Sequence, residues 1–208
     1  MITIPTSDFT GILADVIPFA TNDDELPDTS AVRLEWSGYV ATVHPSPDVS
    51  IPLDRGQAVA YAMGVLQVVA EAEYDAAIAR QIRAMGRLPA GERDQTGQAA
   101  AAATIQQLRE RRPKERTDQT ALEGSPLAFS GGVSALTGDA FVHVHLYGQP
   151  LTQWTPADAR GHAQYVLEAA IVAELDQGYL EFLTTVLALD RETARKVVDN
   201  LGHHRGEG

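Results

Sequence analysis

The chain of 208 residues carries a formal net charge of −12 and contains no cysteine. Its 44% hydrophobic and 21% charged residues are the proportions of a soluble globular protein, not of a disordered chain, and the length is enough for a proper core. The lack of cysteine excludes disulfides, thiolate zinc sites, iron–sulfur clusters and cysteine nucleophiles. The acidic balance argues against non-specific binding to nucleic acid or anionic membranes, where a basic surface supplies most of the affinity.

The apolar windows of the sequence predict a cytoplasmic protein without membrane contact. The first residues, MITIPTSD, lack the basic segment and apolar run of a secretory signal. No window reaches the roughly 18–20 uncharged apolar residues that span a bilayer. The richness in Ala, Asp, Arg and Gly is typical of a bacterial protein from a high-GC genome.

The N-terminal region is predicted to contain a strand, a helix and a hairpin. Residues 2–5 favour a strand, and Ser7 is placed to cap a helix that ends near Pro18. The apolar residues of this helix recur at helical spacing and are Phe9, Ile12, Leu13, Val16 and Ile17. After an acidic loop, the strand-like segments Val32–Trp36 and Tyr39–Val43 flank a two-residue Ser-Gly connection, which indicates a hairpin.

A loop with three prolines leads into a long predicted helix from Asp54 to Met85. The prolines are Pro45, Pro47 and Pro52. Small apolar residues recur in the helix at alternating spacings of four and three, as in a coiled-coil seam. They are Ala58, Ala62, Val65, Val69, Ala72, Ala76 and Ala79. Because small side chains allow close approach, we expect another helix to pack along this seam.

The middle of the chain is polar and is predicted to be a linker with one helix. Residues 86–97 contain Gly and Pro without periodicity, and a helix is predicted from Gln98 to Arg112. The segment Arg109–Arg116 is basic through Arg109, Arg111, Arg112, Lys114 and Arg116. A solvated helix end, with cations near the negative end of the dipole, is the favoured interpretation. A contact for phosphate or an acidic partner is the alternative.

The second half is predicted to contain strands followed by two helices. Strand patterns occur at 127–129, at 141–148 and at 151–154. The run Thr155-Pro156-Ala157-Asp158 favours a helix start, with Thr at the cap and Pro at the first position, and this helix should reach about Val186. A last helix is predicted from an Asp190 cap to a Gly202 stop, with an apolar face of Ala194, Val197, Val198 and Leu201.

Self-similarity suggests that the chain contains a duplication. The segment 65–75 matches 166–176 at an offset of 101, and 31–38 matches 141–148 at an offset of 110. The sequence therefore predicts an α+β fold of two hairpin-plus-long-helix (ββα) units, whose hairpins form one antiparallel sheet with the helices on one face. The predicted parts are residues 1–85, a linker region at 86–125, a second unit at 126–202 and a frayed tail at 203–208.

The stretch FVHVHLYG, residues 141–148, places His143 and His145 on the same face of a strand. Two adjacent imidazoles suggest half of a metal site, but the sequence offers no convincing third ligand. In the duplicated alignment His143 and His145 match Arg33 and Glu35, which favours residues that face solvent.

Other polar motifs are weaker candidates for chemistry. The pairs Glu73/Asp75 and Glu174/Asp176 lie on predicted helices, where residues two apart diverge, so solvated charges are favoured over a metal or acid–base pair. Residues 130–138, SGGVSALTG, lack the Gly-Lys-Ser/Thr of a phosphate loop, and no Gly-x-Ser-x-Gly elbow is present. No catalytic residue and no cofactor are predicted.

Residues 2–43 resemble the opening of the bacterial sliding clamp, the beta subunit of DNA polymerase III. The likeness rests on a short strand, the helix pattern from Asp8 to Val16, a loop that reaches Leu26-Pro27, and the two strands up to Val43. The family usually has Ala-Thr-Asp after the second strand, and here Ala41-Thr42 is followed by Val43. The resemblance implies a clamp-related fragment linked to replication or mobile elements, and it transfers no binding residues.

Taken together, these patterns predict a non-catalytic interaction or accessory protein that binds a protein partner or a second copy. One alternative is a small metal-dependent hydrolase that uses His143 and His145. The other is a nucleic-acid contact through Arg109–Arg116, which the net charge disfavours.

Overall fold

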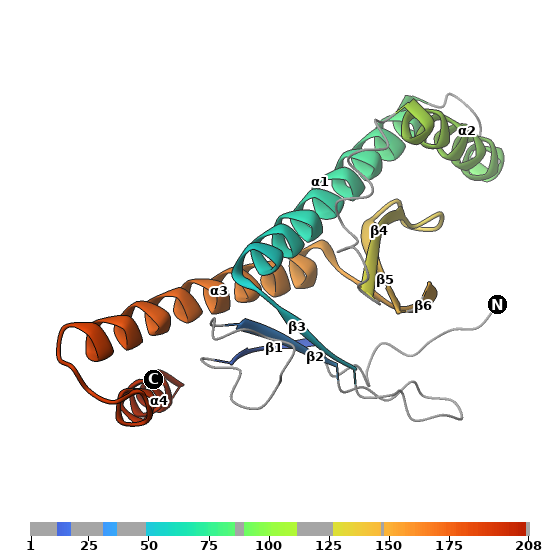
Figure 1. Ribbon diagram of the computed structural model, residues 1–208. Coiled ribbons are helices and arrows are strands. Elements are labelled where there is room, and N and C mark those ends of the chain that lie inside the picture. The colour runs from blue at the N-terminus through green and yellow to red at the C-terminus, as the bar shows by residue number, and fades with distance from the viewer. Residues whose placement is uncertain are drawn as a thin grey trace, which may run out of the picture. The chain divides into compact units, whose positions relative to one another are not determined.

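The computed structural model describes residues 12–17, 31–36, 49–85, 90–111, 127–146 and 148–206 (Figure 1). These residues form a mixed α+β protein in which three strands and two helices are followed by three more strands and two more helices. The strands are β1 (Ile12–Ile17), β2 (Ala31–Trp36), β3 (Val49–Leu53), β4 (Leu127–Val133), β5 (Ala140–Leu146) and β6 (Gln149–Trp154). The helices are α1 (Arg55–Met85), α2 (Ala90–Arg111), α3 (Pro156–Thr185) and α4 (Arg191–Gly206).

The chain divides into two compact units, each of which takes elements from both halves of the sequence. One unit combines β1–β3 and the start of α1, up to Val59, with α3 from Gln164 onwards and α4. The other combines α1 from Ala60, α2 and β4–β6 with the first turns of α3, up to Ala163. Each sheet therefore shares a unit with most of the long helix from the other half of the chain.

The β4–β6 unit is built on a very close approach of β4 to α1. The three strands form an antiparallel sheet in the order β4-β5-β6, and Val142 and Val144 of β5 are fully buried. A Cβ atom added to Gly131 would lie 3.0 Å from the Cβ of Ala72 and 3.2 Å from the backbone oxygen of Val68. Only a glycine opposite an alanine allows the strand and the helix to approach this closely.

The far part of α1 packs against α2. Ala79 of α1 forms a buried cluster with Ala101 and Ile105 of α2, and Ile82 and Val133 pack against it. Figure 1 shows α2 beside the C-terminal end of α1. At the other end of this unit, an aromatic group joins Tyr61, Phe129, Trp154 and His162 through ring contacts of 5.0–5.8 Å between centroids.

The β1–β3 unit contains the second antiparallel sheet, with β2 between β1 and β3. Val32 of β2 and Ile51 and Leu53 of β3 are buried. At the end of α3, α4 packs back so that Leu180 forms a buried cluster with Ala194 and Val198 (Figure 1). The five-residue connection between the two helices, residues 186–190, allows the apolar side of α4 to pack against α3.

The two long helices and their starts confirm the sequence predictions. The helices α1 and α3 match the predicted ranges to within one residue at each end. All seven predicted seam residues of α1 are buried. The Thr155 hydroxyl oxygen accepts from the Asp158 backbone N–H at 3.1 Å, and the Asp190 carboxylate accepts from the Thr193 N–H at 2.9 Å, so both predicted caps are present. The seam packs against β4 as well as α2, not only against a helix.

Several predicted elements are wrong. The helix predicted up to Pro18 is a strand over residues 12–17. The dense apolar run there fits both helical and strand periodicity, and pairing with β2 selects the strand. The proline loop contains strand β3, which tolerates Pro52 because β3 is an edge strand. The single predicted sheet is two sheets. The linker is shorter than predicted, since α2 begins at Ala90, and α4 continues through Gly202 to Gly206.

Other predictions fall on residues that the structure does not describe. These are the strand at 2–5, the hairpin strand Tyr39–Val43 and the residues of the basic segment beyond Arg111. On its two sides β2 has β1 and β3 as neighbours.

Enlarging the side chain at the closest helix–strand contact should destabilise the protein. We expect Ala72→Leu to lower the free energy of unfolding by about 1–3 kcal/mol, because the added atoms have no space beside Gly131. The matched control is Ala70→Leu, which lies on the exposed side of the same helix and should change stability by less than about 0.5 kcal/mol. Urea denaturation measures both. Equal stability of the two variants would show that the contact is not tight.

Candidate functional site

The outer face of the β4–β6 sheet, turned away from the buried valines, carries a row of three rings. They are Phe141, His143 and His145, at alternate positions of the central strand β5. The ring centroids of Phe141 and His143 are 4.6 Å apart, and those of His143 and His145 are 5.8 Å apart. All three side chains are half-buried. The prediction that the two histidines share a face is therefore confirmed, although they are less exposed than solvent-facing residues would be.

Small residues on β4 lie beside this ring row and leave room for it. The Ser130 hydroxyl forms a 2.9 Å hydrogen bond with Nε2 of His145. Gly132 lies opposite Phe141, and a Cβ atom at this glycine would come within 2.2 Å of the Phe141 ring. The Phe141 ring therefore lies directly over the β4 backbone, which no other residue at position 132 would permit.

The pKa of His143 is lowered from its usual value. Partial burial is the largest cause, and the positive charges of His145 and Arg109 add to it. His143 is accordingly neutral at pH 7 and presents an uncharged aromatic ring with one nitrogen donor and one acceptor.

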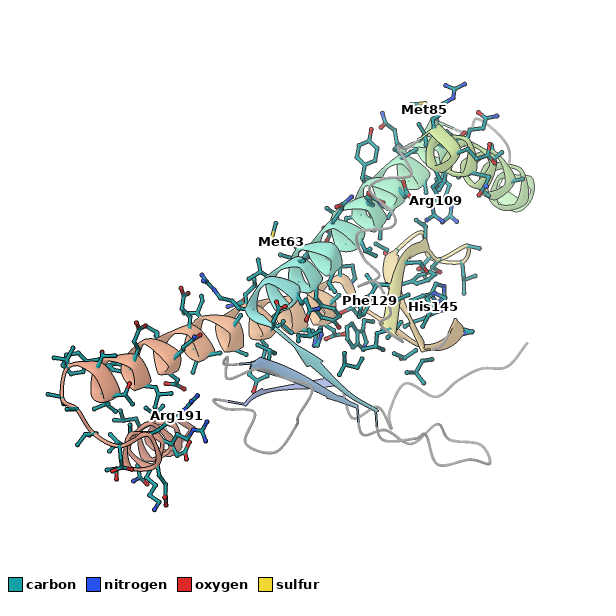
Figure 2. All side chains as sticks on the ribbon, in the orientation of Figure 1. Met63, Met85, Arg109, Phe129, His145 and Arg191 are labelled. Carbon is teal, nitrogen blue, oxygen red and sulfur yellow. The ribbon has the colours of Figure 1, made fainter. Side chains whose placement is uncertain are left out.

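Arg109 of α2 connects the ring row to the core of this unit. Its Nε donates to the carboxylate of Asp75 at 2.9 Å, and its Nη2 donates to the backbone oxygen of Gly131 at 3.0 Å. Figure 2 shows the Arg109 side chain extending from α2 towards the β4–β6 sheet. The guanidinium is thus held in place on the edge of β4 while 38% of the side chain remains exposed.

The two Glu/Asp pairs on the long helices do not form a carboxylate site. Asp75 and Asp176 are buried, at 1% and 2% exposure, so the prediction of solvated charges is wrong for them. Glu73 instead forms a two-pronged ion pair with Arg160, whose hydrogen bonds lower the pKa of Glu73. Asp75 lies three residues after seam residue Ala72, so the seam itself predicts its burial, but the sequence gives no signal for its partner 34 residues away.

Glu174 belongs to the other unit, where it forms a 2.7 Å ion pair with Arg55. Both glutamates are therefore half-exposed ion-pair residues on their own helices. Neither provides a free carboxylate beside a second one.

The basic segment is described only at its beginning. Arg109 is engaged with Asp75, and Arg111 is exposed at the end of α2. Arg112, Lys114 and Arg116 lie outside the described residues. Arg109 lies in the last turn of α2 with its side chain partly exposed, and it also binds a buried carboxylate, which the sequence did not predict.

The ring row has some of the groups that catalysis requires but not a complete set. A serine hydroxyl bonded to an imidazole is the arrangement of a nucleophile and its base. Within the described residues, no carboxylate orients His145 and no group of three His, Asp or Glu side chains is placed to hold a metal ion. The two histidines therefore lack a third protein ligand from this part of the chain.

Helix α3 carries an exposed apolar stripe that sequence reasoning did not single out. Its members recur at spacings of four, four, three and four and fall within about 80° of the helix circumference. They are Ile171, Leu175, Tyr179 and Phe182 of α3 and Val186 directly after its last residue, each 47–64% exposed. We refer to these five residues as the α3 stripe. The opposite side of the helix carries the buried residues Val166, Ala170 and Ala173.

Comparison of the chain with protein-family models, curated protein sequences and solved structures finds no match. Among the described helices, none has the length and apolar character needed to cross a membrane. Function must therefore be inferred from the surfaces described above.

Removing the Arg109 guanidinium should destabilise the β4–β6 unit. We expect Arg109→Met to lower the free energy of unfolding by about 3 kcal/mol, because the buried Asp75 carboxylate loses this partner and α2 loses its tie to Gly131. Arg111→Met is the matched control on the exposed helix end and should cost less than about 0.5 kcal/mol. Urea denaturation at constant pH measures the free energy of unfolding of both variants. An equal decrease in the two would show that the Arg109–Asp75 ion pair does not contribute to stability.

His143 should make the protein less stable in mild acid. Because its pKa is lowered in the folded state, the unfolded chain binds more protons as the pH falls through about 6.5. The stabilising contribution is therefore complete above that pH and is lost below it. We expect the wild type to lose more stability than His143→Asn between about pH 7.5 and pH 5. Parallel slopes in urea denaturation, or an NMR titration midpoint of His143 at or above its usual value, would contradict this.

Proposed function

We propose that this chain is a non-catalytic interaction protein whose α3 stripe binds an amphipathic helix with basic flanks from a protein partner. The observation that carries the proposal is the stripe itself, since five large apolar side chains on one side of a helix are exposed together. A stripe with heptad-like spacing matches the apolar face of a second helix. Exposed apolar residues in such an array mark interaction sites more often than single ones do.

The charge around the stripe favours a basic partner over a second copy. From Gln164 to Thr185, α3 contains four acidic residues and no lysine or arginine. Glu181 and Glu174, of which Glu174 also pairs with Arg55, precede the stripe residues Phe182 and Leu175 and flank the stripe on one side. Two copies of this helix would bring acidic flanks together, whereas a helix with lysine or arginine flanks would complement them.

We also propose that the two halves of the chain are related by duplication. The order of three strands followed by two helices occurs twice, and β2 and β5, which carry the matched strand segments, are both central strands. Asp75 and Asp176, 101 residues apart, are the two buried charged residues among those described. This repeated pattern supports two related units.

The contact between Tyr61 and His162 supports the same proposal. The Tyr61 hydroxyl bonds to Nε2 of His162 at 2.9 Å, and these residues are separated by the same offset of 101. Contact between a residue and its own counterpart is what an isologous arrangement of related halves produces. Burial raises the pKa of Tyr61, so its hydroxyl stays protonated in this contact.

A partner in DNA replication or mobile-element biology is proposed only from the resemblance of residues 2–43 to the sliding clamp opening, in which residues 12–17 form strand β1 and not the helix of that pattern. The place of the chain in the cell and its bacterial origin stay predictions from composition.

Peptide binding tests the α3 stripe. The probe is a synthetic amphipathic helix of Leu and Lys, compared with a Leu and Glu helix that has the same apolar face. We expect the Lys peptide to bind at least about tenfold more tightly, since opposite charges flank the apolar contact. Leu175→Ser with Phe182→Ser should weaken its binding by about tenfold or more, because each buried side chain contributes ~1.5–3 kcal/mol.

Leu136→Ser is the control variant, because Leu136 is an exposed apolar residue in the turn between β4 and β5. It should bind the Lys peptide as the wild type does. Equal affinity for both peptides, or unchanged binding by the doubly substituted stripe, would contradict the proposal. A dimer that the stripe substitutions dissociate in sedimentation experiments would assign the stripe to a second copy instead.

A further inference from the structure

We propose that the outer face of the β4–β6 sheet binds single-stranded nucleic acid, with bases stacking on Phe141, His143 and His145. The inference is independent of the α3 stripe and concerns a different ligand. It rests on the ring row, the composition of the face around it and the fixed position of Arg109.

The rings offer separate stacking surfaces rather than one flat platform. The three residues lie at alternate positions of the central strand, with neighbouring centroids 4.6 and 5.8 Å apart and ring planes inclined at 85° and 54°, so a base would stack on one ring at a time. The imidazole of His143 is neutral at pH 7, because partial burial and neighbouring positive charges lower its pKa. A neutral imidazole supplies a stacking surface and a hydrogen-bonding nitrogen, and sheets that bind single strands use aromatic side chains in this way.

The described strand positions paired with the ring residues carry no carboxylate, although the chain has 28 acidic residues. The strand positions paired with the ring residues on either side are small, neutral or both. They are Ala128, Ser130, Gly132, Pro150 and Gln153. The rings are half-buried beside these small residues, and Gln153 is an exposed amide beside His143. A face of this composition does not repel a polyanion at close range.

Arg109 supplies a cation at the edge of the same sheet. Its Nε and Nη2 are engaged with Asp75 and Gly131, which fixes the orientation of the guanidinium. Among the described residues, no hydrogen bond engages its Nη1, so two donors remain for a phosphate oxygen. Its charge contributes to the lowered pKa of His143, which places it within electrostatic reach of the ring row. A preoriented arginine beside stacking rings combines the two contacts that single strands require.

Oligonucleotide binding, followed by fluorescence anisotropy at constant salt, tests the proposal. The probes are a labelled single-stranded 12-mer of thymidine nucleotides, a duplex of the same length, and a 12-mer with the same phosphates but abasic sugars. We expect the single strand to bind at least about fivefold more tightly than either other probe, because only it offers free bases. Equal binding of all three would overturn the proposal, as would no binding of the single strand at about 100 μM protein.

Substitutions separate stacking from general charge effects. His143→Ala with His145→Ala should weaken single-strand binding by about fivefold or more while leaving the abasic probe unchanged. His143→Phe should retain binding, because phenylalanine keeps the aromatic face for stacking. The variant also shows that stacking does not need the titratable imidazole. Unchanged binding by the double alanine variant would overturn the proposal.

Tyr74→Ala is the matched control, because Tyr74 is an aromatic residue of α1 that is 61% exposed and lies outside the ring row. It should bind the single strand as the wild type does, and an equal loss in this variant would overturn the assignment to the ring row. Circular dichroism establishes that each variant is folded. Free thymidine nucleotides added as competitors show whether one nucleotide accounts for the affinity. If free nucleotide displaced the 12-mer completely at concentrations close to the Kd of the 12-mer, the ligand would be a mononucleotide and not a strand, and the proposal would be overturned.

Discussion

The close contact between β4 and α1 sets the geometry of the whole β4–β6 unit. At Gly131 and Ala72, backbone and methyl group approach to distances that exclude any further side-chain atom. The small residues along the α1 seam make this possible, and they are buried from Ala58 to Ala79. Because alternate residues of a strand point to opposite faces of the sheet, the contact with α1 on one face also determines which residues lie on the other face. The ring row lies on the outer face because the residues between the rings, Val142 and Val144, are buried on the inner face.

The ion pair between Asp75 and Arg109 adds a polar connection to this apolar contact. A buried carboxylate without a cation would be costly, so α2 must hold Arg109 where Asp75 can reach it. The second bond of Arg109, to the Gly131 oxygen, lies at the glycine that makes the close approach. Arg109 of α2 therefore joins α1, through Asp75, to β4, through Gly131. As a consequence, its guanidinium lies partly exposed at the edge of the sheet.

Local patterns in the sequence were sufficient to predict the long helices, but not the pairing of the strands. The α1 and α3 ranges follow from periodicity and capping residues that lie within a few positions of each other. In contrast, β1 has an apolar run that satisfies both helical and strand spacing, and only its pairing with β2 decides. Strand β3 contains Pro52, which the sequence marks as a loop residue and the sheet accepts at its edge.

The candidate site shows the same division between local and distant information. That His143 and His145 share a face follows from the period of a strand. The Ser130 hydroxyl at His145, the glycine beneath Phe141 and the guanidinium near His143 all come from other elements, so spacing within residues 141–148 could not predict them. Asp75 illustrates the limit most clearly, because its place beside the α1 seam predicts burial, whereas no local pattern marks Arg109, 34 residues away, as its partner.

The net charge of −12 disfavours nucleic-acid binding at the level of composition, yet it does not decide what one face can bind. At physiological ionic strength the Debye length is about 8 Å, so an exposed carboxylate farther away than this is largely screened from a bound phosphate. The charges that matter are those beside the ligand, and the paired positions around the ring row contain none that is negative. Stacking is also insensitive to net charge, since it depends on ring faces. If the ring row binds nucleic acid as proposed, stacking would favour unpaired bases over duplex, because an acidic protein supplies little general electrostatic attraction for a polyanion.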